Sequence, residues 1–280
     1  MKYRINKKTG DKISELGFGT SCVVEKDEKS AVEILQKAYE NGINFFDLAT
    51  SQGNCFPYMG KALSQVRKDV IYQIHFGTNY ETGAYGWTTD LETVKRNIDW
   101  QLSNLKTDYI DYGFIHCLDE LSDWEEYQKN GVLDFLLEMK GQGAVKHIGL
   151  SSHTPALIQN VLDEVAVDML MFSVNPGYDY QKGEYAKGSV DERAAVYQRC
   201  ESENIGISVM KPFSGGQLLD AGDVDMVLAT FTITDERKQS VDFSTSYATG
   251  IQSIVVKEDS PITSADDLYA DGADYQIGVQ

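Results

Sequence analysis

Seven alternations of a strand pattern with a helix pattern constrain the fold of this chain more than any other feature. In each unit, a short run of apolar and aromatic residues is followed by apolar residues at helical spacing. Near-continuous apolar strands that alternate with helices favour a parallel sheet covered by helices. The count approaches the eight units of a (β/α)8 barrel, so we predict an α/β fold, an incomplete TIM barrel with an N-terminal hairpin at residues 3–14. The predicted strands are residues 15–20, 43–50, 69–77, 109–117, 145–153, 167–175 and 205–216, the last with its loop.

The alternation stops after Gly216, where the composition also changes. Residues 218–280 hold 12 acidic and 3 basic side chains, a net charge of −9. Strand patterns recur there at 224–234, at 250–259 and after residue 274, and a short helix is expected from Ser264. We therefore predict two domains, residues 1–217 and residues 218–280.

Charge and composition exclude several function classes. The net charge of −18 and the pI of about 4.5 argue against nucleic acid, because phosphate binding needs a basic surface. No stretch approaches the roughly 18 apolar residues of a membrane span. The four cysteines form no CxxC and the four histidines show no zinc spacing, so we expect no metal site. With no secretory signal pattern, we expect a cytoplasmic protein with free thiols.

Six motifs, taken in order, make residues 1 to about 217 resemble the aldo-keto reductases. They are LGFGT, NGINFFDLAT, GKAL, YIDYGFIHC, VKHIGLSSH and SVMKPFSGGQL. The resemblance implies NAD(P)H-dependent reduction of a small-molecule carbonyl substrate. It also implies that the eighth strand and the residues that grip an adenosine 2′-phosphate are missing. Weak or absent binding of NADP(H) or NAD(H) is therefore an alternative.

Members of that family resemble one another in a catalytic tetrad of Asp, Tyr, Lys and His. Two positions match here, Asp47 at the carboxyl end of the second strand and His116 at that of the fourth. Gln52 stands at the Tyr position and His75 at the Lys position, so the tetrad is atypical. A glutamine amide orients an oxygen but supplies no proton at neutral pH. The alternatives are that Asp47 caps the next helix and that the histidines are interior residues.

The same resemblance implies a set of cofactor-binding residues. Ser151 and Ser152 match the residues that hold the nicotinamide carboxamide, and Asn175 matches a glutamine under the ring. The loop that would cradle the pyrophosphate with its backbone amides comprises Lys211, Pro212, Phe213, Ser214, Gly215 and Gly216.

Residues 222 to 280 resemble a different family, the extracytoplasmic solute-binding proteins that deliver polar amino acids to importers. The stretches TITDERK and VDFS carry this resemblance. It implies that Arg237 and Thr232 bind the carboxylate of an amino acid, since an arginine presents a planar fork to a carboxylate. The alternatives to a reductase are thus an amino-acid-binding module or a catalytically inert fusion or chimera.

Overall fold

The computed structural model describes residues 1–179, 185–213, 226–229, 242–243, 253–256 and 277–279. The chain divides into two compact units. The first comprises residues 1–172 and 191–208, and the second comprises residues 173–190 and 209–280. The predicted boundary after residue 217 falls outside the described residues, so the two-domain division stays a prediction.

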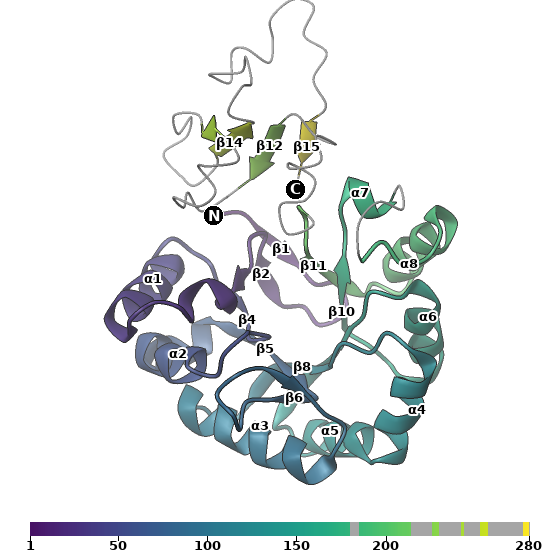
Figure 1. The fold of residues 1–280 in the computed structure, drawn as a ribbon, viewed down its shortest axis with the longest axis horizontal. Coiled ribbons are helices and arrows are strands. Elements are labelled where there is room, and N and C mark those ends of the chain that lie inside the picture. Colours follow the sequence, from purple (N-terminus) through teal and green to yellow (C-terminus); the bar gives the residue numbers. More distant parts are fainter. Residues whose placement is uncertain (180–184, 214–225, 230–241, 244–252, 257–276, 280) are drawn as a thin grey trace, which may run out of the picture. The chain divides into compact units, whose positions relative to one another are not determined.

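A curled sheet of seven parallel strands forms the core of the fold, with helices on its outer side (Figure 1). Its order is β11-β10-β9-β8-β5-β4-β3, and β11 and β3 are the two ends of this path. The order confirms the predicted incomplete (β/α)8 barrel. The strands are β3 (Phe18–Gly19), β4 (Phe45–Asp47), β5 (Ile71–Phe76), β8 (Ile110–Ile115), β9 (Val145–Ser151), β10 (Met169–Ser173) and β11 (Gly206–Met210).

Helices follow the strands where the apolar spacing predicted them. Asp27 and Asp90 cap α1 and α3, each accepting a hydrogen bond from the main chain of its first turn. Gly131, at φ +79°, separates α4 from α5, as its position in the sequence suggested. The helices are α1 (Glu28–Glu40), α2 (Cys55–Leu63), α3 (Leu91–Leu105), α4 (Leu121–Lys129), α5 (Val132–Gly141), α6 (Pro155–Glu164) and α8 (Val190–Ser202).

Several elements differ from the sequence-based expectation. Helix α2 begins at Cys55, five residues before the GKAL motif, because Pro57 is compatible with the first turn of a helix. A short helix α7 (Pro176–Asp179), which the strand and helix pattern did not indicate, follows β10. The structure also contains two 3-10 helices, η1 (Thr20–Val23) and η2 (Ser64–Asp69). A small antiparallel hairpin is formed by β6 (Thr78–Asn79) and β7 (Gly86–Trp87).

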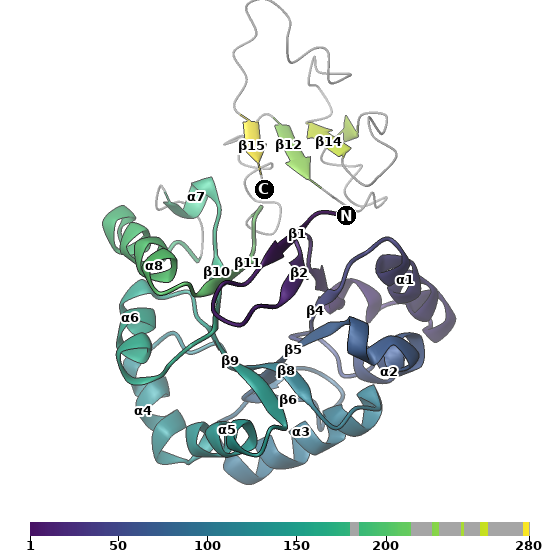
Figure 2. The same cartoon turned by 180° about the vertical axis from the view of Figure 1, so that it is seen from behind.

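The expected N-terminal hairpin is present as β1 (Tyr3–Ile5) and β2 (Lys12–Ser14), paired antiparallel (Figure 2). The sheet buries aromatic side chains on both faces. Phe45, Tyr112, Phe114 and Met169 pack together in one cluster. Such burial stabilises the fold by about 25 cal/mol per Å² of apolar surface removed from water.

The described strands of the second unit form a sheet of their own in the order β13-β14-β12-β15. β12 (Met226–Ala229) pairs antiparallel with β14 (Ser253–Val256) and parallel with β15 (Ile277–Val279). These three lie within the predicted strands, and β13 (Asp242–Phe243), which was not predicted, pairs antiparallel with β14. The helix expected from Ser264 lies outside the described residues. No helix in the described ranges has the length and apolar character needed to cross a membrane.

Candidate active site

Three predicted tetrad positions meet at the carboxyl ends of neighbouring strands. Asp47 ends β4, His75 lies one residue before the end of β5, and His116 directly follows β8. Because β4, β5 and β8 are consecutive parallel neighbours, their ends lie side by side. The sequence could place these residues together because strand ends of a parallel sheet share one edge.

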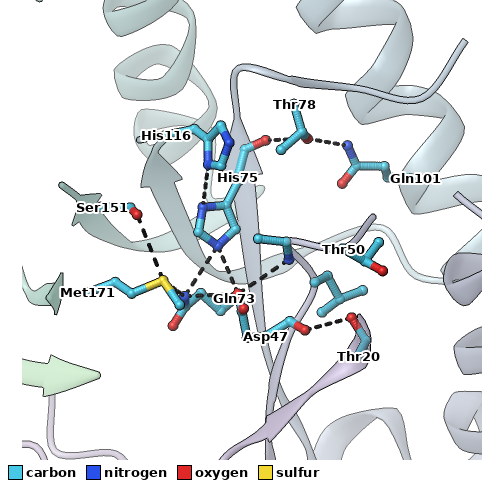
Figure 3. A network of polar contacts seen from close by, with 12 residues as sticks. Thr20, Asp47, Thr50, Gln73, His75, Thr78, Gln101, His116, Ser151 and Met171 are labelled. Atoms are coloured by element: carbon cyan, nitrogen blue, oxygen red, sulfur yellow. Dashed lines mark hydrogen bonds and ion pairs between the residues drawn. The ribbon is translucent and has the colours of Figure 1, made fainter. Parts of the chain in front are cut away.

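The three side chains form one hydrogen-bonded chain (Figure 3). His75 Nε2 lies 2.8 Å from Asp47 Oδ1, and His75 Nδ1 lies 2.9 Å from His116 Nδ1. Gln73 Nε2 donates a second hydrogen bond to Asp47 Oδ1 at 3.0 Å. Thr20 Oγ1 donates to the Asp47 carbonyl at 2.8 Å, which fixes the end of β4. The arrangement links a carboxylate to a second imidazole through a first.

A tyrosine that the sequence analysis did not single out extends this chain. The Tyr85 hydroxyl lies 2.9 Å from His116 Nε2. Tyr85 directly precedes β7, in the hairpin that follows β5. The adjacent Trp87 Nε1 donates to the His116 carbonyl at 3.4 Å, so the hairpin contacts His116 twice. We call Asp47, His75, His116 and Tyr85 the relay.

Backbone pairing between two loops explains why Tyr85 reaches the site. Gly53 N donates to Gly83 O and Tyr85 N donates to Ser51 O, each at 2.9 Å. Gln52 and Ala84 thereby form an antiparallel bridge. The loop that carries Gln52, where the family resemblance places a tyrosine, therefore holds Tyr85 through its neighbours.

Burial sets the protonation of His116 and Tyr85. The pKa of His116 lies well below 6.5, because burial disfavours the imidazolium and the neighbouring His75 adds to that effect. Burial, helped by the nearby Cys117, raises the pKa of Tyr85 to about 12. At neutral pH His116 is thus uncharged and Tyr85 keeps its hydroxyl proton.

Two nearby side chains stand apart from the relay. Gln52 is exposed in its loop, and its main chain holds the bridge described above. Tyr58 lies within α2, where its hydroxyl accepts a 3.4 Å hydrogen bond from Asn54 Nδ2.

The predicted cofactor residues divide between the two units. Ser151 is buried at the end of β9, where its hydroxyl donates to the Met171 sulfur at 3.8 Å and its carbonyl accepts from Leu118 N at 3.2 Å. Ser152 donates to Asp119 Oδ1 at 3.3 Å. In the second unit, Asn175 Nδ2 donates to the Lys211 carbonyl and Asn175 Oδ1 accepts from Tyr178 N, each at 2.8 Å.

The rest of the predicted loop is only partly described. Pro212 and Phe213 are half-buried in the second unit, next to Lys211. Lys211 has a left-handed backbone with φ +52°. Ser214, Gly215, Gly216, Thr232 and Arg237 lie outside the described residues.

A second polar group follows the ends of β8 and β9. Atoms of Cys117, Asp119 and His153 that are chemically suited to a metal ion lie within 4.8 Å of one another. Asp119 accepts from His153 N at 2.7 Å and lies 2.9 Å from His153 Nδ1. Asp119 also accepts a hydrogen bond from Ser152 Oγ. These contacts join the loop after β8 to the loop after β9, a structural role that requires no ion.

The sequence model of the Aldo/keto reductase family matches residues 15–249. This chain belongs to the aldo/keto reductase family. The aldo/keto reductase fold is also seen in a solved structure from Bacillus halodurans, a holo-form aldo-keto reductase. Its TM-score is 0.64 at 22% identity, covering 90% of this chain and 74% of that chain.

Two relatives lie near 30% identity. YqkF of Bacillus subtilis, an oxidoreductase, is 30% identical over 169 residues, covering 58% of this chain and 53% of that protein. L-galactose dehydrogenase of Arabidopsis thaliana is 30% identical over 178 residues, with the same coverages of 58% and 53%. This aldo/keto reductase chain thus spans about half the length of these two relatives.

A third similarity concerns a different class of protein. The glutamine-binding protein of Geobacillus stearothermophilus is 49% identical over 51 residues, which are 18% of this chain and 20% of that protein. This similarity supports the resemblance of residues 222–280 to the solute-binding proteins.

Proposed function

We propose that this aldo/keto reductase interconverts a small-molecule carbonyl compound and its alcohol with NAD(P)H. The relay is the observation that carries the proposal. It joins Asp47 to His116 through His75 at the carboxyl edge of the sheet, where a barrel of this type places its chemistry. Carbonyl reduction needs a proton where negative charge develops on oxygen, and a chain of ionisable groups can deliver one.

The residues described fit a nicotinamide in part. The Ser151 hydroxyl is buried and, among the residues that the structure describes, donates weakly to the Met171 sulfur, so it can hydrogen-bond a carboxamide. A bound nicotinamide would supply or accept the hydride. Asn175 already holds main-chain atoms with both ends of its amide, which makes it a support for the loop at Lys211.

Cofactor binding by the purified full chain tests the proposal first. Titration with NADPH and with NADH, followed by nicotinamide fluorescence, should saturate for at least one of them. Ser151→Ala should weaken that binding, whereas Ser103→Ala, at an exposed position on α3, should leave it unchanged. Absence of any binding at millimolar cofactor would exclude the reductase function. A catalytically inert fusion would then be the better description.

The similarity to a glutamine-binding protein supports a second candidate function. We propose that the segment after residue 217 derives from a solute-binding protein, so that the chain joins parts of two families. Calorimetric titration with glutamine and a panel of polar amino acids tests retained binding. A heat of binding for one amino acid that is lost in Arg237→Ala would support a binding module. The absence of a heat of binding for every amino acid in the panel would exclude it.

A further inference from the structure

The atypical tetrad leaves one role open, because Gln52 carries no proton that it can donate at neutral pH. We propose that Tyr85 is the residue that exchanges a proton with the substrate oxygen. We further propose that one added proton on the His75–His116 pair reverses the direction of the relay. The inference rests on the proposed carbonyl–alcohol chemistry, which it deepens by naming the proton path.

Exposure identifies Tyr85 as the end of the relay that a substrate can reach. Its side chain is 43% exposed, whereas His116 is 4% and His75 1% exposed. The bridge between Gln52 and Ala84 places the tyrosine beside the loop of the missing tetrad tyrosine. The hydroxyl group that the family resemblance implies at position 52 is thus supplied by Tyr85, on the loop paired with it.

Donor and acceptor rules fix the proton positions when both histidines are neutral. A carboxylate only accepts, so His75 Nε2 carries the proton toward Asp47. His75 Nδ1 is then an acceptor, and His116 Nδ1 must donate to it. This leaves His116 Nε2 as an acceptor, to which the Tyr85 hydroxyl donates. In this state the tyrosine oxygen is prepared to receive a proton.

One additional proton reverses two of the three hydrogen bonds. With His75 protonated on both nitrogens, Nδ1 donates to His116 Nδ1, and the positive charge lies 2.8 Å from Asp47. His116 Nε2 then carries a proton and donates to the Tyr85 oxygen. The Tyr85 hydroxyl is released to donate to a substrate carbonyl.

The two states correspond to the two directions of the reaction. In alcohol oxidation, the alcohol carbon loses hydride to the oxidised nicotinamide and the alcohol O–H bond breaks. That proton goes to the Tyr85 oxygen while the tyrosine proton passes to His116 Nε2 and the His116 Nδ1 proton passes to His75. Carbonyl reduction runs the same transfers backwards, and the hydride comes from the reduced nicotinamide. Electrons and protons balance in both directions without a further reactant.

Charged and titratable groups on several elements surround the relay. The Asp47 carboxylate on β4 lies 2.8 Å from His75 Nε2. Asp119 favours protonation of His116, whereas His153, two residues after β9, opposes it. Cys117 opposes ionisation of Tyr85.

Substitution of Tyr85 by phenylalanine tests the proton role. In Tyr85→Phe, hydride transfer should fall by about 10²–10⁴-fold, the usual contribution of general acid–base catalysis. Cofactor binding should be unchanged, and Tyr58→Phe should behave as the wild type. Reduction by the wild type should fall with rising pH while oxidation rises over the same interval. An active Tyr85→Phe enzyme with wild-type pH profiles would overturn the inference and leave the proposed function standing.

Histidine ¹⁵N spectra of the cofactor-free chain give an independent readout. At high pH they should show His75 protonated on Nε2 and His116 protonated on Nδ1. At lower pH a single proton should enter the pair, and Tyr85→Phe should shift the His116 Nε2 resonance only. The opposite tautomers would overturn the relay. A wild type that binds cofactor but transfers no hydride would overturn the proposed function, and the inference with it.

Discussion

The Nδ1 atoms of His75 and His116 face each other at 2.9 Å. Two imidazole nitrogens can share such a contact only if one carries a proton and the other does not. The protonation of each ring therefore determines that of its neighbour. In the tetrad that the family resemblance implies, a lysine would stand at position 75, and an ammonium group only donates. The histidine makes a reversible relay possible.

Restoring a tyrosine at position 52 should compensate for the loss of Tyr85. The loops that carry the two positions are bridged at Gln52 and Ala84, so a hydroxyl on either loop can approach the same substrate oxygen. We expect the double variant Gln52→Tyr/Tyr85→Phe to recover at least about tenfold over Tyr85→Phe, within the range that general acid catalysis contributes. Steady-state reduction rates measure this. No recovery at any pH would mean that the two loops do not serve one site.

Stability should fall as the pH decreases below about 6.5, the ordinary pKa of histidine. Burial lowers the pKa of His116 in the folded protein, so the unfolded chain binds more protons in this range. Unfolding is then favoured as the pH falls, by at most about 1.4 kcal/mol per pH unit for one proton. Urea unfolding at several pH values checks this. His116→Gln should show a shallower dependence, and an identical slope would contradict the assignment.

The buried ion pair of Arg67 and Asp111 should be among the most sensitive positions of the barrel. Asp111 Oδ2 lies 2.7 Å from Arg67 Nη2, and Asp111 Oδ1 lies 2.8 Å from Lys146 Nζ. Asp111→Ala leaves a buried guanidinium without its partner and should cost about 3–5 kcal/mol of unfolding free energy. Glu15→Ala, which removes an exposed pair, should cost about 0–1 kcal/mol. Equal losses of unfolding free energy in the two variants, measured by urea denaturation, would contradict this prediction.

Two glycine substitutions should have opposite effects because their surroundings differ. A Cβ on Gly60 in α2 would overlap the Asn104 carbonyl oxygen near the end of α3. Gly60→Ala should therefore push the helices apart and cost about 1–3 kcal/mol. A Cβ on Gly141 in α5 meets nothing within 4 Å, so Gly141→Ala should be neutral or stabilising by up to about 1 kcal/mol. Thermal unfolding of both variants decides between these expectations.

Local patterns were sufficient to predict the barrel strands, and the family resemblance singled out three members of the relay, Asp47, His75 and His116. Strand and helix periodicity is a short-range property, and Asp47 and His116 follow strands whose ends must share an edge. The start of α2 was placed too late, because the polar run before Pro57 resembles a turn. A proline in the first helical turn is compatible with a helix, and this was the missed signal.

Tyr85 was beyond such reasoning because its position depends on a pairing between loops. The contacts of residues 51–53 with residues 83–85 join segments about thirty positions apart, and no periodicity encodes them. A local signal existed in the Thr82–Gly83 pair between two aromatic residues, a pattern typical of a hairpin turn. Gly83 has φ +85°, as such a turn requires.

A single-turnover measurement of hydride transfer in wild type and His116→Gln tests the relay most directly. Glutamine retains hydrogen-bonding atoms but cannot pass a proton from one side to the other. With saturating NADPH or NADH and a reducible carbonyl compound, the wild type should lose nicotinamide absorbance at least about 100-fold faster than the variant. Both proteins should bind the cofactor equally well. Equal rates in the two proteins would contradict a relay through His116.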